Sequence, residues 1–450
     1  MWANWSSEQV CRPAAVERPG GTAGVVAALE RAATSGRTVR VAGSGHSFSD
    51  LVPTAGVLLD LRRMNRVIDA DRASGRVRVE AGITLRVLNE RLAERGLALE
   101  NLGDIDAQTL AGALATGTHG TGARFPNLSA QVEGLELALA DGRVVELSRE
   151  SDFDACRAAR VGLGALGVVT AVTLACVPAF TLHGVDEPMP LEGTLDGLDE
   201  LVDGHEHFEL FTFPYSPLAL TRRSDPTDRP PDPPSRARAY LDDVLLQNRA
   251  FELFCRAGRR APGAIPRLNR LVARLAGRRE RVDASHRIFA TPRLVRFTEM
   301  EYAVPRAEAA TAIRAVRALV EERRFAVNFP IELRFVASDD ALLSPAAGRE
   351  TAYVAVHLFE GIPAYAFFGA VEEVMDELGG RPHWGKRHFQ TAATLRGRYP
   401  EWDWFASVRA RLDPDGRFAS PGIERVLGPV ASAAEAVAAG PQRKQRPSPR

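Results

Sequence analysis

Glycine-rich runs near the start of the chain constrain its fold more than any other feature. The first, residues 43–50 (GSGHSFSD), directly follows a β-rich run at residues 37–42. Glycines let the backbone turn with positive φ and approach a ligand closely. Successive free N–H groups in such a turn form an anion-binding nest, which suits a pyrophosphate. The run is no P-loop, because no Gly-Lys-Ser/Thr follows it, and a plain glycine-rich turn is the alternative.

A second run, residues 116–122 (TGTHGTG), offers backbone donors and threonine hydroxyls. Two loops of this kind in one domain favour a dinucleotide with two phosphates. A third run, residues 162–167 (GLGALG), matches the G-x-G-x-x-G pattern of nicotinamide dinucleotide sites. That pattern needs a following helix and a later acid, whereas here a strand-like run follows. We therefore expect the third run to be a tight turn against a flat ring or a neighbouring strand.

Length and charge restrict the class of protein. A chain of 450 residues favours two domains. Lys+Arg and Asp+Glu are equal at 57 each, so a nucleic-acid partner is not expected. The four cysteines show no CxxC spacing, which is typical of a reducing compartment. Because a secretory signal and an integral membrane segment are both absent from the sequence pattern, we expect a cytoplasmic protein.

Charged residues on an apolar strand indicate a buried site. Glu332 and Arg334 lie two residues apart in FPIELRFV and therefore share one face of a strand. Burying both is costly unless they pair or take part in chemistry, although a structural ion pair on a half-exposed strand is the alternative. The loop HWGK around Lys386 is either a ligand surface or a solvated turn. His205 and His207 lack a third ligand at metal-site spacing, so no metal is expected.

The runs RVAGSGHSFSD, GTHGTG, IELRFVASDDALLSP, GRPHWGKRH and RLDPDGRF together resemble the sugar-lactone oxidase branch of the vanillyl-alcohol-oxidase flavoprotein family. The resemblance spans residues 5–428. It implies an α+β fold, in which residues 1–180 form a two-subdomain FAD-binding domain of the PCMH type. Residues 181–395 would form an α+β substrate cap, and residues 396–430 would return to the FAD domain. Composition predicts a disordered tail at residues 431–450.

The resemblance also implies the site residues. His46 would bond covalently to the 8α carbon of the flavin. The other implied FAD contacts are Gly43, Ser44, Gly45, Ser47, Thr118, His119, Gly122, Gly167 and Val169. The implied substrate residues are Glu332, Arg334, Lys386 and His357.

The implied reaction is oxidation of a sugar 1,4-lactone, L-gulono-1,4-lactone or D-arabinono-1,4-lactone. Hydride would pass from the C2 carbinol to flavin N5 and give an ascorbate-type product. The electron acceptor would be oxygen, a quinone or a cytochrome, and peripheral contact with a membrane stays open. The alternatives are an alditol oxidase and a flavin-binding protein without turnover. Ala113 and Phe359 stand where alditol oxidases carry serine and threonine, which favours a lactone ring over an open polyol.

Overall fold

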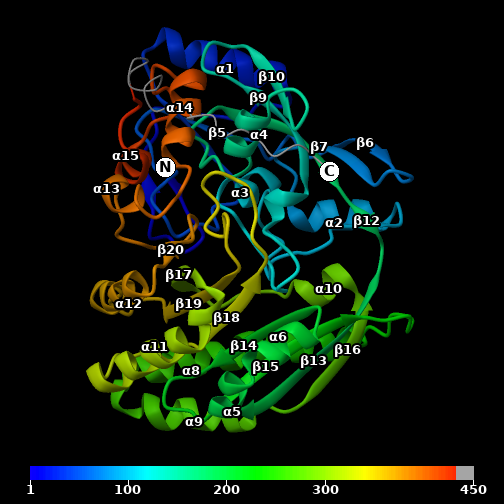
Figure 1. Cartoon of the computed structure of the whole chain (residues 1–450), viewed down its shortest axis with the longest axis vertical. Coiled ribbons are helices and arrows are strands. Elements are labelled where there is room, and N and C mark those ends of the chain that lie inside the picture. Colours follow the sequence, from blue (N-terminus) through cyan, green and yellow to red (C-terminus); the bar gives the residue numbers. More distant parts are fainter. Residues whose placement is uncertain (432–450) are drawn as a thin grey trace, which may run out of the picture.

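The protein is described by a computed structural model that covers residues 1–431 (Figure 1). The predicted tail, 431–450, lies outside these residues apart from Ala431. Two regions lie one above the other: an N-terminal region that also holds the last helices, and a cap with one large sheet (Figure 1). Within the described residues, no helix has both the length and the hydropathy that a bilayer span requires.

A small parallel sheet begins the N-terminal region, with strand order β3-β5-β4. Its strands are β3 (Ala15–Glu17), β4 (Val39–Ala42) and β5 (Val57–Asp60). Helix α1 (Thr22–Thr34) buries Val25, Ala28, Leu29 and Ala32 in the core beside this sheet. This spacing of three and four residues gives one apolar face. Because β4 ends at Ala42, the first glycine run begins at the carboxyl end of a parallel strand.

A second sheet of five antiparallel strands completes the N-terminal region, in the order β10-β9-β11-β7-β6. The strands are β6 (Val67–Asp71), β7 (Arg76–Glu80), β9 (Val132–Ala138), β10 (Val144–Ser148) and β11 (Val168–Ala175). The helices beside it are α2 (Leu85–Ala93), α3 (Leu110–Ala115) and α4 (Phe153–Arg160). Helix α3 leads directly into the second glycine run, and β11 follows the third.

The cap is built on an eight-stranded antiparallel sheet with the order β16-β13-β15-β14-β18-β19-β17-β20. The longer strands are β13 (Thr181–Pro190), β14 (His207–Thr212), β15 (Leu218–Pro226), β16 (Arg279–Ala284), β17 (Phe297–Pro305), β18 (Ile331–Val336) and β19 (Thr351–Phe359). Strand β20 (Arg381–Pro382) is short. In the middle of the sheet β14 pairs with β18, and these two strands are far apart in the chain, so the centre of the sheet collects residues from distant segments.

The two faces of the cap sheet have opposite character. On β18, Ile331, Leu333 and Phe335 pack in the cap core, whereas Glu332 and Arg334 point to the other face. This follows from the two-residue repeat of a strand. The helices against the apolar face are α5 (Leu191–Asp196), α6 (Leu198–Gly204), α11 (Ala309–Arg323) and α12 (Tyr365–Glu377).

A helical excursion between β15 and β16 covers part of the charged face. It comprises α7 (Arg236–Ala239), the π-helix η2 (Tyr240–Ala250), α8 (Phe251–Arg260), the 3-10 turn η3 (Pro262–Ala264) and α9 (Ile265–Leu275). Asn269 on α9 anchors it by donating to the carbonyls of Pro214 and Val327. The excursion therefore forms an outer wall over this face of the sheet.

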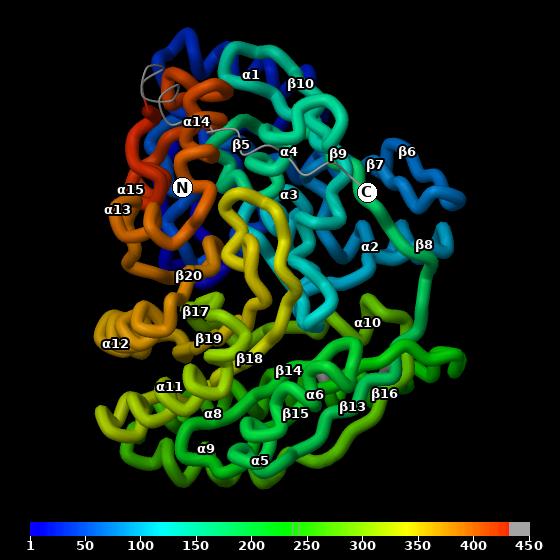
Figure 2. The backbone as a smooth tube through the Cα atoms, viewed as in Figure 1, coloured from blue at the N-terminus to red at the C-terminus, as the bar shows by residue number. Residues whose placement is uncertain are grey.

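The end of the described chain returns to the N-terminal region. Helices α13 (Ala392–Leu395), α14 (Trp402–Leu412) and α15 (Pro421–Leu427) contribute to its core. Leu342 and Leu343 join the same core from the loop between β18 and β19, which reaches up from the cap (Figure 2).

The remaining short elements are β1 (Trp2–Ala3), β2 (Val10–Cys11), β8 (Leu97–Ala98), η1 (Leu128–Gln131), β12 (Val177–Pro178), α10 (Ser285–Phe289) and η4 (Arg306–Glu308). The predicted α+β class is confirmed, because helices are combined with largely antiparallel sheets.

Candidate active site

The first glycine run lines a narrow cavity of about 120 Å³ in the N-terminal region. Gly45 has φ +75° and Gly164, which also lines this cavity, has φ +63°, conformations that favour glycine. A side chain at Gly43 would place its Cβ 2.3 Å from Oγ1 of Thr109. The cavity therefore depends on glycine for both its backbone turns and its close packing. Its lining includes Gly43, Ser44, Gly45, His46, Ser47, Gly112, Thr116, Gly162, Gly164, Gly167 and Val169.

Buried Arg40 holds the third glycine run in place against this cavity. Its Nη1 donates to the carbonyl of Gly164 at 2.8 Å and its Nη2 donates to that of Leu163 at 2.8 Å. Burial lowers the pKa of Arg40 to about 9, so the guanidinium is still charged near neutral pH. The run is thus a turn held by backbone acceptors and ends in β11, as expected of a tight turn against a neighbouring strand.

His46 stands where the first cavity meets the cap. A small hollow lined by His46, Gln108, Phe297 and Lys386 shares residues with both the first cavity and a larger one under the cap. The indole of Trp5 stacks on the His46 ring, with centroids 5.5 Å apart. Burial and then the nearby Lys386 ammonium lower the pKa of His46, which keeps the imidazole neutral.

The larger cavity, of about 450 Å³, lies between the charged face of the cap sheet and the N-terminal region. The helical excursion closes its outer side. Its charged and histidine lining comprises Asp104, His119, Asp186, Arg222, Arg279, Arg293, Glu299, Glu301, Glu332, Arg334, His357, His383 and Lys386. A buried cavity with this many ionisable groups is a candidate active site.

Arg334 is the centre of one charged group in this cavity. It pairs with Glu332, its Nε lies 2.9 Å from Oε2 of Glu209, and its Nη2 lies 3.3 Å from Oδ2 of Asp104. Asp104 also pairs with Arg293 at 2.8 Å. Arg334 therefore connects two strands of the cap with a loop of the N-terminal region.

Glu332 is a carboxyl of this group whose pKa is raised. Burial raises its pKa to about 7; Arg334 opposes that rise, whereas Asp104 and Glu209 add to it. Several carboxylates compete for one guanidinium, so protonation of one of them relieves the repulsion. Glu332 can thus exchange a proton near neutral pH.

Lys386 is the centre of a second charged group. Its Nζ lies 2.5 Å from Oε2 of Glu299 and 3.9 Å from Oε2 of Glu301. The other oxygen of Glu299 lies 3.4 Å from Nε2 of His357. Burial alone would lower the pKa of Lys386, but Glu299 and Glu301 outweigh it and raise that pKa. Lys386 is therefore a fixed positive charge beside the hollow that holds His46.

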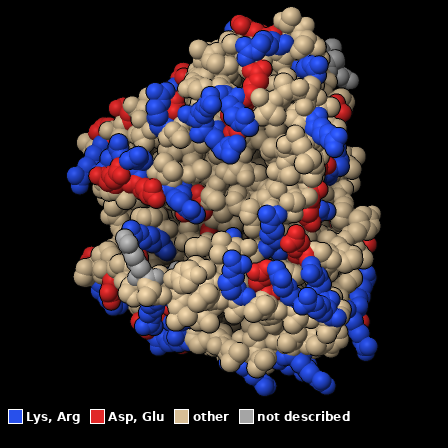
Figure 3. Space-filling model, turned by 180° about the vertical axis from the view of Figure 1, so that it is seen from behind, with Lys and Arg blue, Asp and Glu red and all other residues tan. Residues whose placement is uncertain are grey.

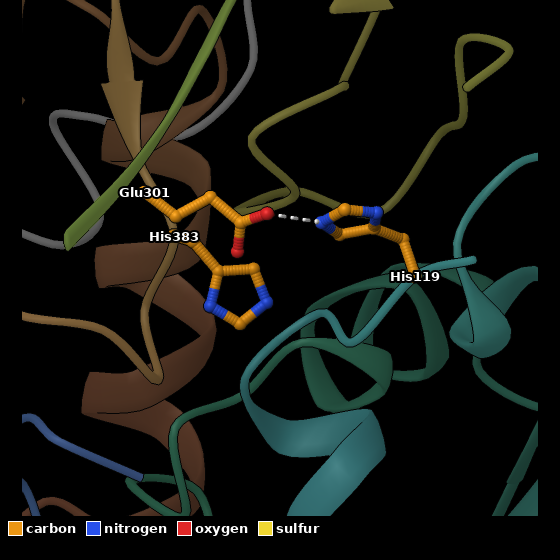
Figure 4. A group of neighbouring side chains, drawn as sticks. All are labelled: His119, Glu301 and His383. Atoms are coloured by element: carbon orange, nitrogen blue, oxygen red, sulfur yellow. Dashed lines mark ion pairs between the residues drawn. The ribbon is translucent and has the colours of Figure 1, made fainter. Parts of the chain in front are cut away.

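His119, Glu301 and His383 form a further cluster, with one potential ligand atom from each within 4.8 Å of the others (Figure 4). Nε2 of His119 lies 3.3 Å from Oε1 of Glu301, and Nδ1 of His383 accepts from the N–H of Gly385. Two histidines and a glutamate suit a divalent cation. The Lys386 ammonium beside Glu301 opposes a second cation, so we assign the cluster to the charged wall of the cavity.

Most of the predicted residues line one of the two cavities, but some predicted FAD contacts do not line the glycine-lined cavity. Thr118 and His119 line the larger cavity rather than the glycine-lined one. Gly122 lines neither of these cavities; its N–H donates to the carbonyl of Phe335, where the second glycine run packs on the cap. Glu332, Arg334, Lys386 and His357 all line the larger cavity.

Two positions used to favour a lactone do not line the larger cavity. Ala113 is buried in the core of the N-terminal region, and Phe359 packs among the aromatic residues Phe48, Phe297 and Phe329. Neither residue therefore offers or withholds a hydroxyl partner in that cavity, and the argument for a lactone from these two positions is not supported.

Sequence reasoning missed several acids of the site. Glu299 and Glu301 lie two residues apart in the run FTEMEY, the same pattern that singled out Glu332 and Arg334.

The rarity of lysine in this chain is a second feature of the sequence that points to Lys386. Lys386 and Lys444 are the two lysines of a chain that has 57 lysines and arginines. Because a compact ammonium and a planar guanidinium are not interchangeable, a rare lysine in an arginine-rich chain is a candidate functional residue.

The fold and the two joined cavities define a class of protein: an FAD-linked oxidoreductase. The family model for D-arabinono-1,4-lactone oxidase matches residues 172–426, and an FAD binding domain matches residues 13–148. The chain belongs to the D-arabinono-1,4-lactone oxidase family.

Relatives span nearly the whole chain. L-gulono-1,4-lactone dehydrogenase of Mycobacterium tuberculosis H37Rv is 50% identical, covering 95% of this chain and 99% of the relative. L-gulonolactone oxidase of Bos taurus is 34% identical, covering 94% and 97%. Alditol oxidase of a Streptomyces species is 33% identical, covering 95% and 98%. The crystal structure of cholesterol oxidase from Brevibacterium sterolicum shares the fold, with a TM-score of 0.79 at 17% identity over 95% and 96% of the chains.

Proposed function

We propose that the protein oxidises a sugar 1,4-lactone, L-gulono-1,4-lactone or D-arabinono-1,4-lactone, at its C2 carbinol to give an ascorbate-type product. One observation carries the proposal: Glu332, Arg334, Lys386 and His357 line one cavity, which meets the glycine-lined cavity at His46. The relatives named for lactones match over almost the full chain.

The residues of the glycine-lined cavity fit FAD. Backbone turns at Gly45 and Gly164 and the hydroxyls of Ser44 and Ser47 surround a space that a Cβ at Gly43 would narrow. These groups would hold the pyrophosphate and ribityl chain. When bound, the flavin supplies the hydride acceptor, and the protein supplies placement and electrostatics.

The charged cavity orients the lactone and handles the proton. Arg334 and Lys386 stabilise negative charge on the substrate oxygen while its hydroxyl proton leaves. Glu332, with a pKa of about 7, is the group that accepts this proton. Glu299 positions Lys386 and His357 by pairing with both. In this oxidation the carbinol loses one hydride from carbon and one proton from oxygen.

We further propose that His46 bonds covalently to the flavin. The neutral imidazole has the lone pair that such a bond requires, because burial and Lys386 lower its pKa. Trp5 fixes the plane of the ring by stacking. His46 lines the hollow that it shares with Lys386, at the junction of the cavities, and this position supports the proposed link.

The proposal is tested by anaerobic mixing of the purified yellow enzyme with L-gulono-1,4-lactone, D-arabinono-1,4-lactone or xylitol, while flavin absorbance is followed. Bleaching by a lactone at a rate at least ten times that with xylitol is expected. Faster bleaching by xylitol would identify an alditol oxidase instead, and no bleaching by any of these would indicate a flavin binder without turnover. Reoxidation by air, a quinone or cytochrome c then identifies the acceptor.

A further inference from the structure

The helical excursion of the cap has a charge pattern unlike the rest of the chain. Residues 253–279 contain eight arginines and no aspartate or glutamate, although basic and acidic residues balance over the whole sequence. On the side of the molecule seen in Figure 3, Lys and Arg side chains lie on both halves, and those of the lower half lie on the cap. The excursion is thus a local positive region on a neutral protein.

Helix α9 presents arginine and leucine on the same exposed face. Arg267, Arg270, Leu271, Arg274 and Leu275 recur every three or four residues, and all are exposed. The exposed fraction is 54% for Leu271 and 74% for Leu275. The opposite face of α9 is buried against the cap. Leucine side chains exposed to water are unfavourable, and a group of them is typical of a surface that contacts an apolar partner.

The neighbouring helices of the excursion also carry exposed apolar residues and arginines. Leu253 on α8 is 67% exposed, and Arg256 and Arg260 follow it at helical spacing. On η2, the exposed apolar residues are Tyr240, Leu241, Leu245 and Leu246. We call the exposed side of residues 240–275 the leucine–arginine face.

The arginines of this face differ in whether they form ion pairs with carboxylates. Arg256 pairs with Glu252 at 2.7 Å. Over residues 1–431, no ion pair with a carboxylate is formed by Arg260, Arg267, Arg270 or Arg274. Guanidinium groups without carboxylate partners beside exposed leucines are suited to phosphate groups at the surface of an apolar phase.

We propose that the leucine–arginine face docks on an anionic membrane surface. The leucines enter the boundary between headgroups and acyl chains, and the arginines bind lipid phosphates. A helix that lies in the interface needs no spanning length. The inference does not depend on which substrate the enzyme oxidises.

The docking face lies at the outer end of the larger cavity. Leu246 and Leu275 are exposed on the face and also line that cavity, together with Phe251 and Val272. The same helices therefore form both the apolar wall of the cavity and the proposed contact surface. Docking would bring this end of the cavity to the lipid.

The test is co-sedimentation of the full-length holoenzyme with vesicles of pure phosphatidylcholine or of phosphatidylcholine with phosphatidylglycerol. The test variant combines Leu253→Gln, Leu271→Gln, Arg267→Gln and Arg274→Gln, none of which lines the larger cavity. The matched control is Ile68→Gln with Arg63→Gln, exposed residues of the N-terminal region.

Wild type and control are expected to bind only the anionic vesicles, and binding is expected to weaken in high salt. The test variant is expected to bind at least about tenfold more weakly, with unchanged lactone turnover in solution as proof of folding. Absence of wild-type binding, or equal binding by the test variant, would overturn the proposal. A second outcome is also distinguishable. If wild type does not bind vesicles, and light scattering shows a dimer for wild type but not for the test variant, the face would be assigned to a second copy of the chain.

Discussion

The ammonium nitrogen of Lys386 lies 2.5 Å from Oε2 of Glu299 in the wall of the larger cavity. Lys386 comes from the loop after β20 and Glu299 from strand β17, so the pair joins two segments that are distant in the chain. Burial would raise the pKa of Glu299, but Lys386 and His357 outweigh it and keep the carboxylate ionised. The pair fixes one positive charge beside His46.

Glu299→Gln is expected to slow flavin reduction by lactone about 10- to 100-fold, because Lys386 and His357 lose their shared partner. Glu299 raises the pKa of both groups, so the limb of the pH–rate profile at high pH should move to lower pH in the variant. Anaerobic stopped-flow reduction across pH measures both effects. Glu8→Gln, which removes the partner of neighbouring Arg387, is the control. An unmoved profile in Glu299→Gln would rule out the positioning role.

Lys386→Met leaves an unbranched side chain, shorter than that of lysine by the terminal nitrogen, and removes its charge. We expect the rate constant of flavin reduction to fall by about 10²- to 10³-fold, since charge on the substrate oxygen is then less well stabilised. Lys386→Arg should recover little of this loss, because a planar guanidinium does not reproduce a compact ammonium between Glu299 and Glu301. Arg387→Gln at the adjacent position should reduce its flavin at the wild-type rate. Full activity of Lys386→Met would remove the residue from the mechanism.

Glu332 predicts a specific dependence of stability on pH. Burial raises its pKa from 4.5 to about 7 in the folded protein, so the folded state binds the extra proton between these values. The free energy of unfolding therefore falls as pH rises through this window, by about 3 kcal/mol for this group. Glu332→Gln cannot ionise and should lose this part of the decline.

The measurement is chemical unfolding of wild type and Glu332→Gln at pH 5, 6, 7 and 8. The difference in unfolding free energy, variant minus wild type, should increase with pH. Glu350→Gln, on the surface, serves as the control and should show a flat difference. A flat difference for Glu332→Gln as well would mean that Glu332 is already ionised at pH 5.

Acid precipitation tests the proposed covalent link. Wild-type pellets should stay yellow, whereas His46→Ala should release its flavin into the supernatant. The variant should still purify with FAD, because the glycine-lined cavity is unchanged by the substitution. A colourless wild-type pellet would reject the bond from His46 and leave the rest of the site intact.

The sequence alone determined the local features of this protein. The turn at 43–50 and the shared face of Glu332 and Arg334 follow from glycine conformation and from the two-residue repeat of strands. These properties depend on neighbours in the chain, so they can be deduced from a short stretch of it.

Tertiary structure decided which groups surround Arg334 and Lys386. Asp104 reaches Arg334 from the N-terminal region, and Glu209 reaches it from β14, because β14 pairs with β18 across a long separation in the chain. The second glycine run was likewise divided: His119 lines the larger cavity, while Gly122 packs on the cap. Strand order and the docking of two regions set these contacts, and neither is encoded by any local pattern of residues.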